Sequence, residues 1–134
     1  MKFAVALALA FAGLAAASPV VRRDTIAHCG QSTGGDIDVD QIRSQVEDAP
    51  TQSTGDHSYP HQFYNYEKIP LSSDCDGASM MLELPIFADG HPYDLQHGEQ
   101  PGAVRAIYSA DNNALCAVVA HNNNNGDFHL CSTN

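Results

Sequence analysis

The spacing of apolar residues predicts one helix, in the segment 36–49. Its apolar positions at helical spacing are Ile42, Val46 and Ala49. Asp38 or Asp40 can cap the start of this helix, and Pro50 follows its end. We expect the helix to cover one face of a sheet.

Short stretches in which apolar and polar residues alternate follow the predicted helix, and they predict strands. The expected strands cover residues 59–63, 79–86, 103–108, 114–121 and 128–131. Asp111, Asn112 and Asn113 are typical of a hairpin turn, and 88–102 is a surface loop rich in Gly and Pro. One helix followed by antiparallel strands indicates the α+β class.

Two charged residues lie within these apolar strands. Glu83 alternates with Leu82 and Leu84, so it lies on the opposite face of its strand. Such a carboxylate lies either on the solvent face of an antiparallel sheet or in a functional site, and the pattern leaves both open. Arg105 shares a face with Ile107, where a cation is costly unless it meets an anion.

The segment 58–67 contains a histidine, a carboxylate and four aromatic rings. If it is extended, the two-residue repeat puts Tyr59, His61 and Phe63 on one face. A turn after Phe63 would bring a further ring and Glu67 to the same place. A base-recognition pocket beside a proton-transfer site needs these groups, although a Tyr-rich, half-buried strand explains the same residues.

Isolated polar groups fall within, or at the ends of, four different predicted strands. They are His61, Glu83, Arg105 and His121. Two imidazoles, a carboxylate and a guanidinium can take a proton from a nucleophile, donate one to a leaving group and stabilise a phosphoryl centre. The sequence has no motif of a serine nucleophile, a phosphate-binding Gly loop or a zinc hydrolase.

The N-terminal sequence predicts secretion. Residues 1–17 have the basic start, short apolar run and small-residue exit of a signal peptide, and the run is too short to span a membrane. Residues 18–23 end in Arg22 and Arg23, a dibasic processing site of a short pro-peptide. The mature chain is then 24–134, the size of one domain.

The chain is acidic, with a formal charge of −10 at pH 7. Removal of 1–23 takes away three of its six cationic residues and none of its 16 acids, which gives −13. Such a protein repels polyanions over most of its surface, so general nucleic-acid binding by counterion release is not expected. The chain can still bind a phosphate group if its few cationic residues are concentrated at one point.

Four cysteines in a short secreted chain indicate two disulfides. They are Cys29, Cys75, Cys116 and Cys131. No two of them are close enough in sequence for a zinc finger, and their number alone allows three pairings. We therefore predict no metal and no other cofactor.

Together these motifs resemble the fungal guanyl-specific ribonuclease family, of the ribonuclease T-one and U-two type. The matching segments are 59–61, 65–67, 83–86, 101–105, 112–115 and the tail from His121 to Phe128. They occur in the family's order and cover almost all of the chain from His57 on. The resemblance implies the microbial ribonuclease fold, in which one helix packs on a central antiparallel sheet and the cleft lies on the opposite face.

The resemblance also implies a reaction. Glu83, assisted by His61, would take the proton from a ribose 2′-OH, and His121 would protonate the departing 5′-oxygen. Arg105 and Tyr59 would bind the phosphoryl oxygens. The product would be a 2′,3′-cyclic phosphate, which is then hydrolysed to a 3′-phosphate. Single-stranded RNA is the implied partner, and DNA is excluded because it lacks the 2′-OH.

A guanine site is implied as well. Its substrate-binding residues would be Phe63, Tyr64, Asn65, Tyr66, Glu67, Asp127 and Phe128. Glu67 would accept hydrogen bonds from guanine, and Phe63 and Tyr66 would hold the ring between them. Tyr64 stands where the family has an asparagine and the 122–127 loop is shorter, so a broader purine preference also fits.

Cysteine spacing is similar to that of ribonuclease U-two and the ribotoxins, which implies the pairs Cys75–Cys116 and Cys29–Cys131. Ribotoxins are basic and have long loops, so we do not expect this acidic chain to act as one. The prediction is a secreted, monomeric endoribonuclease that cuts after guanosine or purines and does not associate with membranes. The alternatives are a catalytically weak RNA-binding effector or cytotoxin of the same fold, and a structural or ligand-binding domain.

Overall fold

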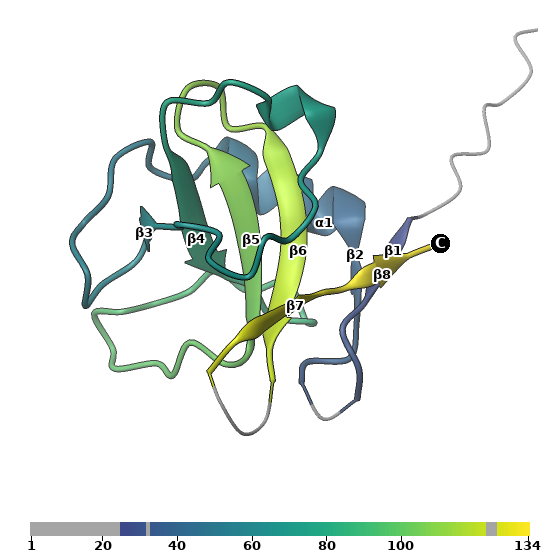
Figure 1. The fold of residues 1–134 in the computed structure, drawn as a ribbon. Helices are drawn as coiled ribbons and strands as arrows, with labels where there is room; N and C mark the ends of the chain where they lie inside the picture. Colours follow the sequence, from purple (N-terminus) through teal and green to yellow (C-terminus); the bar gives the residue numbers. More distant parts are fainter. Residues whose placement is uncertain (1–24, 32, 123–125) are drawn as a thin grey trace, which may run out of the picture.

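A computed structural model describes residues 25–31, 33–122 and 126–134 (Figure 1). The strands are β1 (Ile26–His28), β2 (Asp36–Asp38), β3 (His61–Gln62), β4 (Met81–Pro85), β5 (Val104–Ser109), β6 (Leu115–His121), β7 (Phe128–Leu130) and β8 (Ser132–Thr133). Helix α1 (Val39–Glu47) follows β2, and a single 3-10 turn, η1 (Ser73–Cys75), precedes β4. The predicted signal peptide and pro-peptide lie outside the described residues.

The main sheet has five antiparallel strands in the order β3-β4-β5-β6-β7. In Figure 1, α1 lies behind this sheet. The predicted hairpin turn joins β5 to β6, where the N–H of Asn113 donates to the carbonyl of Ser109 at 2.9 Å. The predicted α+β class, with a helix packed on an antiparallel sheet, is confirmed.

Helix α1 is shorter than the sequence pattern predicts. Asp38 caps its start by accepting from the N–H of Asp40, and Asp36–Asp38 pair with β1 instead of extending the helix. Ile37, in the middle of this strand, is 1% exposed, so burial favours the extended conformation there. At the end of the helix, the side-chain amide of Asn113 donates to the carbonyl of Val46, in the last turn, and to that of Ala49, just after it, at 2.7 and 2.9 Å.

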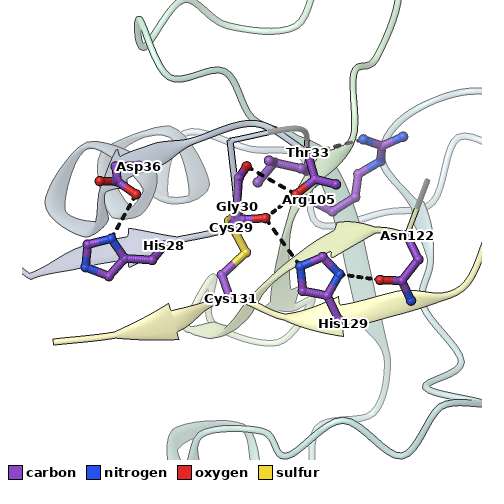
Figure 2. Close-up of a disulfide and its surroundings, with 10 residues drawn as sticks. His28, Cys29, Gly30, Thr33, Asp36, Arg105, Asn122, His129 and Cys131 are labelled. Carbon is purple, nitrogen blue, oxygen red and sulfur yellow. Dashed lines mark hydrogen bonds and ion pairs between the residues drawn. A yellow bond between two sulfur atoms is a disulfide. The ribbon is translucent and has the colours of Figure 1, made fainter.

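A second sheet, which the sequence did not predict, has the order β2-β1-β8. One disulfide joins Cys29 to Cys131 next to this sheet, and the other joins Cys75 to Cys116, so the structure has the pairing that the resemblance implied. Figure 2 shows that the carbonyl of Cys29 also accepts hydrogen bonds from the Thr33 hydroxyl and from one ring nitrogen of His129. The His129 contact fastens the N-terminal hairpin to β7, and the Thr33 contact closes the turn within the hairpin.

The two faces of the main sheet carry different clusters of buried side chains. On one face, residues of the sheet pack with Ile42 and Val46 of α1; they are Leu82, Ile86, Val104, Ala106, Tyr108, Val118 and Ala120. The other face carries Phe63, Ile69, Cys75, Ile107, Cys116, Ala117 and Val119. Since Glu83 pairs with Ile107 across β4 and β5, it belongs to the face away from the helix.

Candidate active site

Glu83 is held in the middle of β4, between strands on both sides. It pairs in register with His61 of β3 and with Ile107 of β5, and it is only 5% exposed. The interpretation of Glu83 as a solvent-face residue is therefore wrong, because neighbouring strands and loops cover this face. Nε2 of His61 lies 2.8 Å from Oε1 of Glu83.

Burial raises the pKa of Glu83 above its ordinary value of 4.5, because the charged carboxylate is desolvated. The nearby charges of His61 and Arg105 oppose this rise, and Glu67 adds to it. A carboxylate whose pKa is raised holds a proton more strongly and is a better general base than a solvated one. The environment of Glu83 is thus suited to proton transfer.

Arg105, on β5, is 2% exposed and is tied to the loop before it. Nη1 donates to the carbonyls of Pro101, Gly102 and Val104 at 3.1, 2.9 and 3.0 Å. Nε is buried and has no hydrogen-bond acceptor among the described residues. A buried cation with an unpaired N–H is costly, and a nearby anion would lower that cost.

Tyr59 connects the arginine to the histidine. Its hydroxyl accepts from Nη2 of Arg105 at 2.9 Å, and its ring stacks on the ring of His61 with centroids 4.7 Å apart. The guanidinium carbon of Arg105 also lies 5.0 Å from the centroid of the Tyr59 ring, within cation–π range. One phenol thereby fixes the relative positions of two predicted catalytic groups.

His121 ends β6 and lies opposite Phe128 of β7, with ring centroids 4.0 Å apart. Nδ1 lies 2.7 Å from the carbonyl oxygen of Gly126, so Nδ1 carries the proton and donates it there. This leaves Nε2 for chemistry. Burial lowers the pKa of His121 below its ordinary value of 6.5; the charge of Arg105 lowers it further, while the Gly126 carbonyl and Glu67 oppose the change.

The predicted catalytic residues come from neighbouring strands of one sheet and influence one another electrostatically. The charge of Arg105 acts on both Glu83 and His121, and that of Glu67 acts on the same two groups. The sheet therefore gathers a carboxylate, two imidazoles and a guanidinium, which the sequence placed in separate segments.

A cavity of about 170 Å³ lies beside this cluster. Its lining residues are His61, Gln62, Phe63, Tyr64, Asn65, Tyr66, Glu67, Glu83 and Phe128. All but one of the predicted substrate-binding residues lie here; Asp127 is exposed, does not line the cavity, and accepts through its backbone carbonyl from the N–H of Asn122. Gln62 was not predicted, since nothing in its sequence context distinguishes it from a surface residue.

The aromatic residues of the cavity are arranged differently from a simple pair of walls. Phe63 is 4% exposed and packs edge-on against Phe128, with centroids 5.9 Å apart. Tyr66 is 81% exposed and stacks on Tyr64. In this structure Phe63 therefore lines the inner end of the cavity, and the tyrosines form its outer edge.

Two polar residues complete the cavity wall. Oε1 of Glu67 accepts from the backbone N–H of Phe128 at 3.2 Å, which joins the loop after β3 to β7. The side chain of Asn65 bonds to both backbone groups of Ile69, donating at 3.0 Å and accepting at 2.7 Å. Asn65 thus holds the loop in shape, and Glu67 connects this loop to β7.

A second cavity, of about 410 Å³, adjoins the other side of His61. It is lined by Asp56, His57, Tyr59, His61, Tyr93, Leu95, Gly98, Glu99, Gln100 and Pro101. Tyr93 packs edge-on against Tyr59 with centroids 5.3 Å apart. The only sign of this in the sequence is that Tyr93 is an aromatic residue within a Gly- and Pro-rich loop. Within the described residues, no His, Cys, Asp and Glu side chains form a group of three that could hold a metal.

Comparison with known proteins connects this site to a family. A family model described as ribonuclease matches residues 23–132. Ribonuclease clavin of Aspergillus clavatus is 36% identical over 103 residues, which cover 56% of this chain and 58% of clavin. The chain thus spans less than two thirds of that relative. Guanyl-specific ribonuclease T1 of Aspergillus oryzae is 30% identical over 101 residues, which cover 74% of this chain and 72% of the relative.

Solved structures show the same fold. Restrictocin, an Aspergillus ribotoxin solved in complex with a 29-mer sarcin/ricin domain RNA analog, matches with a TM-score of 0.59 and 31% identity over 72% of this chain and 85% of its own. A deletion mutant of alpha-sarcin matches with a TM-score of 0.62 and 28% identity over 80% of this chain and 98% of its own. The chain belongs to the ribonuclease family, together with the fungal guanyl-specific ribonucleases and the ribotoxins.

Proposed function

We propose that this protein is a secreted endoribonuclease that cleaves single-stranded RNA after guanosine or another purine. The observation that carries the proposal is the 2.8 Å contact between His61 and the buried Glu83, on the same sheet face as Arg105. A base, a supporting imidazole and a cation at one place are what phosphoryl transfer to a ribose hydroxyl requires.

In the first step, Glu83 takes the proton from the 2′-OH, and His61 assists by stabilising the negative charge that develops on the 2′-oxygen. The 2′-oxygen attacks the adjacent phosphorus, and the bond from phosphorus to the 5′-oxygen of the next nucleotide breaks. Arg105, with the Tyr59 hydroxyl bound to it, stabilises the charge on the phosphoryl oxygens. The raised pKa of Glu83 supports its role as the base.

His121 gives the proton to the departing 5′-oxygen. Its Nδ1–H is bound to Gly126, so Nε2 is the nitrogen that faces this task. The product is a 2′,3′-cyclic phosphate. In the second step a water molecule takes the place of the leaving group: His121 accepts its proton, Glu83 returns a proton to the 2′-oxygen, and a 3′-phosphate results.

The base of the cleaved nucleotide binds in the 170 Å³ cavity, where Glu67 accepts hydrogen bonds from the N–H groups of the base. DNA is not a substrate, because it lacks the 2′-OH. The protein acts as a monomer. This is supported by the fact that one chain supplies every proposed catalytic group. Secretion is supported by the sequence of 1–17 and by two disulfides, which persist in oxidising compartments.

The charge of the chain argues against ribosome-directed cleavage of the ribotoxin kind. The formal charge of −10, or −13 without residues 1–23, gives little attraction to a highly charged RNA particle. We therefore propose general cleavage of single-stranded RNA. The alternative that the experiment must distinguish from it is an RNA-binding protein with weak catalytic activity.

The test is cleavage of the dinucleotides GpC, ApC and UpC by the intact protein and by its Glu83→Ala form. We expect a 2′,3′-cyclic phosphate from GpC, and from ApC if the preference covers purines, with loss of both in the variant. Glu47→Ala, an exposed change on α1, is the matched control. No cleavage by the intact protein, with binding of GpC retained, would favour the RNA-binding alternative.

A further inference from the structure

Two tyrosines form an exposed, ordered ring pair beside the base cavity. Tyr64 and Tyr66 are 56% and 81% exposed, and they are the only exposed large aromatic residues in the described part of the chain. Their rings stack with centroids 5.5 Å apart and an angle of 19° between planes. Adjacent exposed rings form a contiguous patch, which marks a candidate interaction site, and the flat face of this patch suits a ligand with a flat face.

The loop that carries the pair is fixed. Asn65, between the tyrosines, has a φ of 51°, and its side chain binds both backbone groups of Ile69. The N–H of Lys68 also donates to the carbonyl of Asn65 at 3.1 Å. A loop held in this way presents its rings with little loss of conformational entropy on binding.

The cavity itself has little room. Its 170 Å³ is below the roughly 300 Å³ at which pockets for drug-sized ligands begin, so it fits one base and no neighbouring nucleoside. Any further base of an RNA chain must lie outside. Tyr64 and Tyr66 line the cavity at its outer edge. Since Tyr66 is assigned to the base in the cavity and stacks on Tyr64, the other face of Tyr64 is the nearest flat surface to such a base.

We propose that the outer face of Tyr64, whose inner face stacks on Tyr66, is a second base-binding surface, which stacks on the base of the nucleotide 5′ to the cleaved one. This rests on the proposed function and extends it to the neighbouring nucleotide. The 3′ nucleoside leaves with the oxygen that His121 protonates, and His121 does not line the base cavity, so the tyrosines lie on the 5′ side. Stacking needs no positive charge, which suits a chain with a formal charge of −10.

The test compares two trinucleotides that can be cut only at the G–C bond. One is dApGpC, in which the first sugar lacks a 2′-OH; the other has an abasic spacer in place of the deoxyadenosine. Both carry the same phosphates, so the ratio of their kcat/KM values isolates the 5′ base. We expect the intact protein to prefer dApGpC by about fivefold or more.

Tyr64→Ala should bring this ratio close to one, and Tyr64→Phe should keep it, because phenylalanine preserves the ring. Leu130→Ala, an exposed change on β7, is the control for a general effect of removing surface apolar groups. A ratio near one in the intact protein, or an unchanged ratio in Tyr64→Ala, would overturn the proposal.

Failure of the proposed function gives a different result, since all of the trinucleotides and GpC would then stay uncut. Calorimetric binding of the all-deoxy trimer dApdGpdC and of its abasic counterpart then decides the matter. Tighter binding of the trimer with adenine, lost in Tyr64→Ala and kept in Tyr64→Phe, supports the stacking surface; equal binding of the two overturns it.

Discussion

The side chains of Glu83 and His61 are 2.8 Å apart but lie in different environments: Glu83 is almost fully buried, and His61 is about a quarter exposed. A proton that reaches the carboxylate can therefore be exchanged with solvent through the imidazole. Their positions follow from strand register, because the two residues lie directly opposite each other on β4 and β3.

Glu83→Gln should keep the fold and remove the base. Glutamine has the same shape and can still receive a hydrogen bond from His61, but it cannot take a proton at neutral pH. Loss of a general base lowers kcat by about 10²–10⁴-fold. The measurement is kcat with GpC, and a reduction smaller than about tenfold would contradict the assigned role.

The acid limb of the pH–rate profile should report Glu83. The base must be ionised, and burial raises its pKa, so the rate should rise with pH through a pKa above 4.5. This limb should disappear from the residual activity of Glu83→Gln. An intact protein whose rate is already constant well below pH 4.5 would show that a group other than a buried carboxylate is the base.

The alkaline limb should report His121. As the proposed general acid, His121 must be protonated, and burial lowers its pKa, so the rate should fall as pH rises through a pKa below 6.5. The two limbs together give a bell-shaped profile with its optimum on the acid side of neutrality. Titration of the His121 ring by NMR gives the same pKa directly, and a value above 6.5 would be inconsistent with this environment.

Glu67 should determine the choice among purines. A carboxylate can accept both N–H groups on one edge of guanine, whereas adenine offers it no such pair of donors. Glu67→Gln should therefore lower the ratio of kcat/KM for GpC over ApC by about tenfold or more. Because the variant also weakens the contact to Phe128, the ratio is the quantity to measure; an unchanged ratio would assign selection to other groups.

The disulfides should contribute strongly to stability. They close loops with sequence separations of 102 and 41 residues, for which chain entropy gives about 4–5 kcal/mol each at 25 °C. Removing Cys29 and Cys131 together as alanines should lower the free energy of unfolding in urea by that amount, and slightly more than removing the other pair. A loss below about 1 kcal/mol would mean that the contacts of His129 and Thr33 hold this region alone.

The sequence allowed the sheet face of the site to be predicted because the central strands are long. Over the six residues of β5, alternation separates Arg105 and Ile107 from the residues that pack on α1. The same regularity puts Glu83 on that face, but it does not tell whether the face is covered. Alternation reports which face a residue occupies; burial depends on loops that are distant in sequence.

Other parts could not be predicted for physical reasons. Strands β1, β2 and β8 have two or three residues each, too few for a periodic pattern, and they form through pairing with distant segments. The stacking of Tyr64 on Tyr66 depends on the positive φ of Asn65, which an extended segment would not have. Sequence reasoning identified the rings but not their arrangement.

The pairing of β1 with β8 has a practical consequence. The backbone N–H of Ile26 donates to the side chain of Asn134, and Ala27 lies opposite Thr133, so the two ends of the described chain are adjacent. The Cys29–Cys131 disulfide connects them two residues further in than the Ala27–Thr133 pair. The chain is thus suited to circular permutation. Joining residue 134 to residue 25 through a short linker and opening the chain in the exposed 95–98 segment would create new termini in a loop that belongs to neither sheet, so that every strand pairing remains.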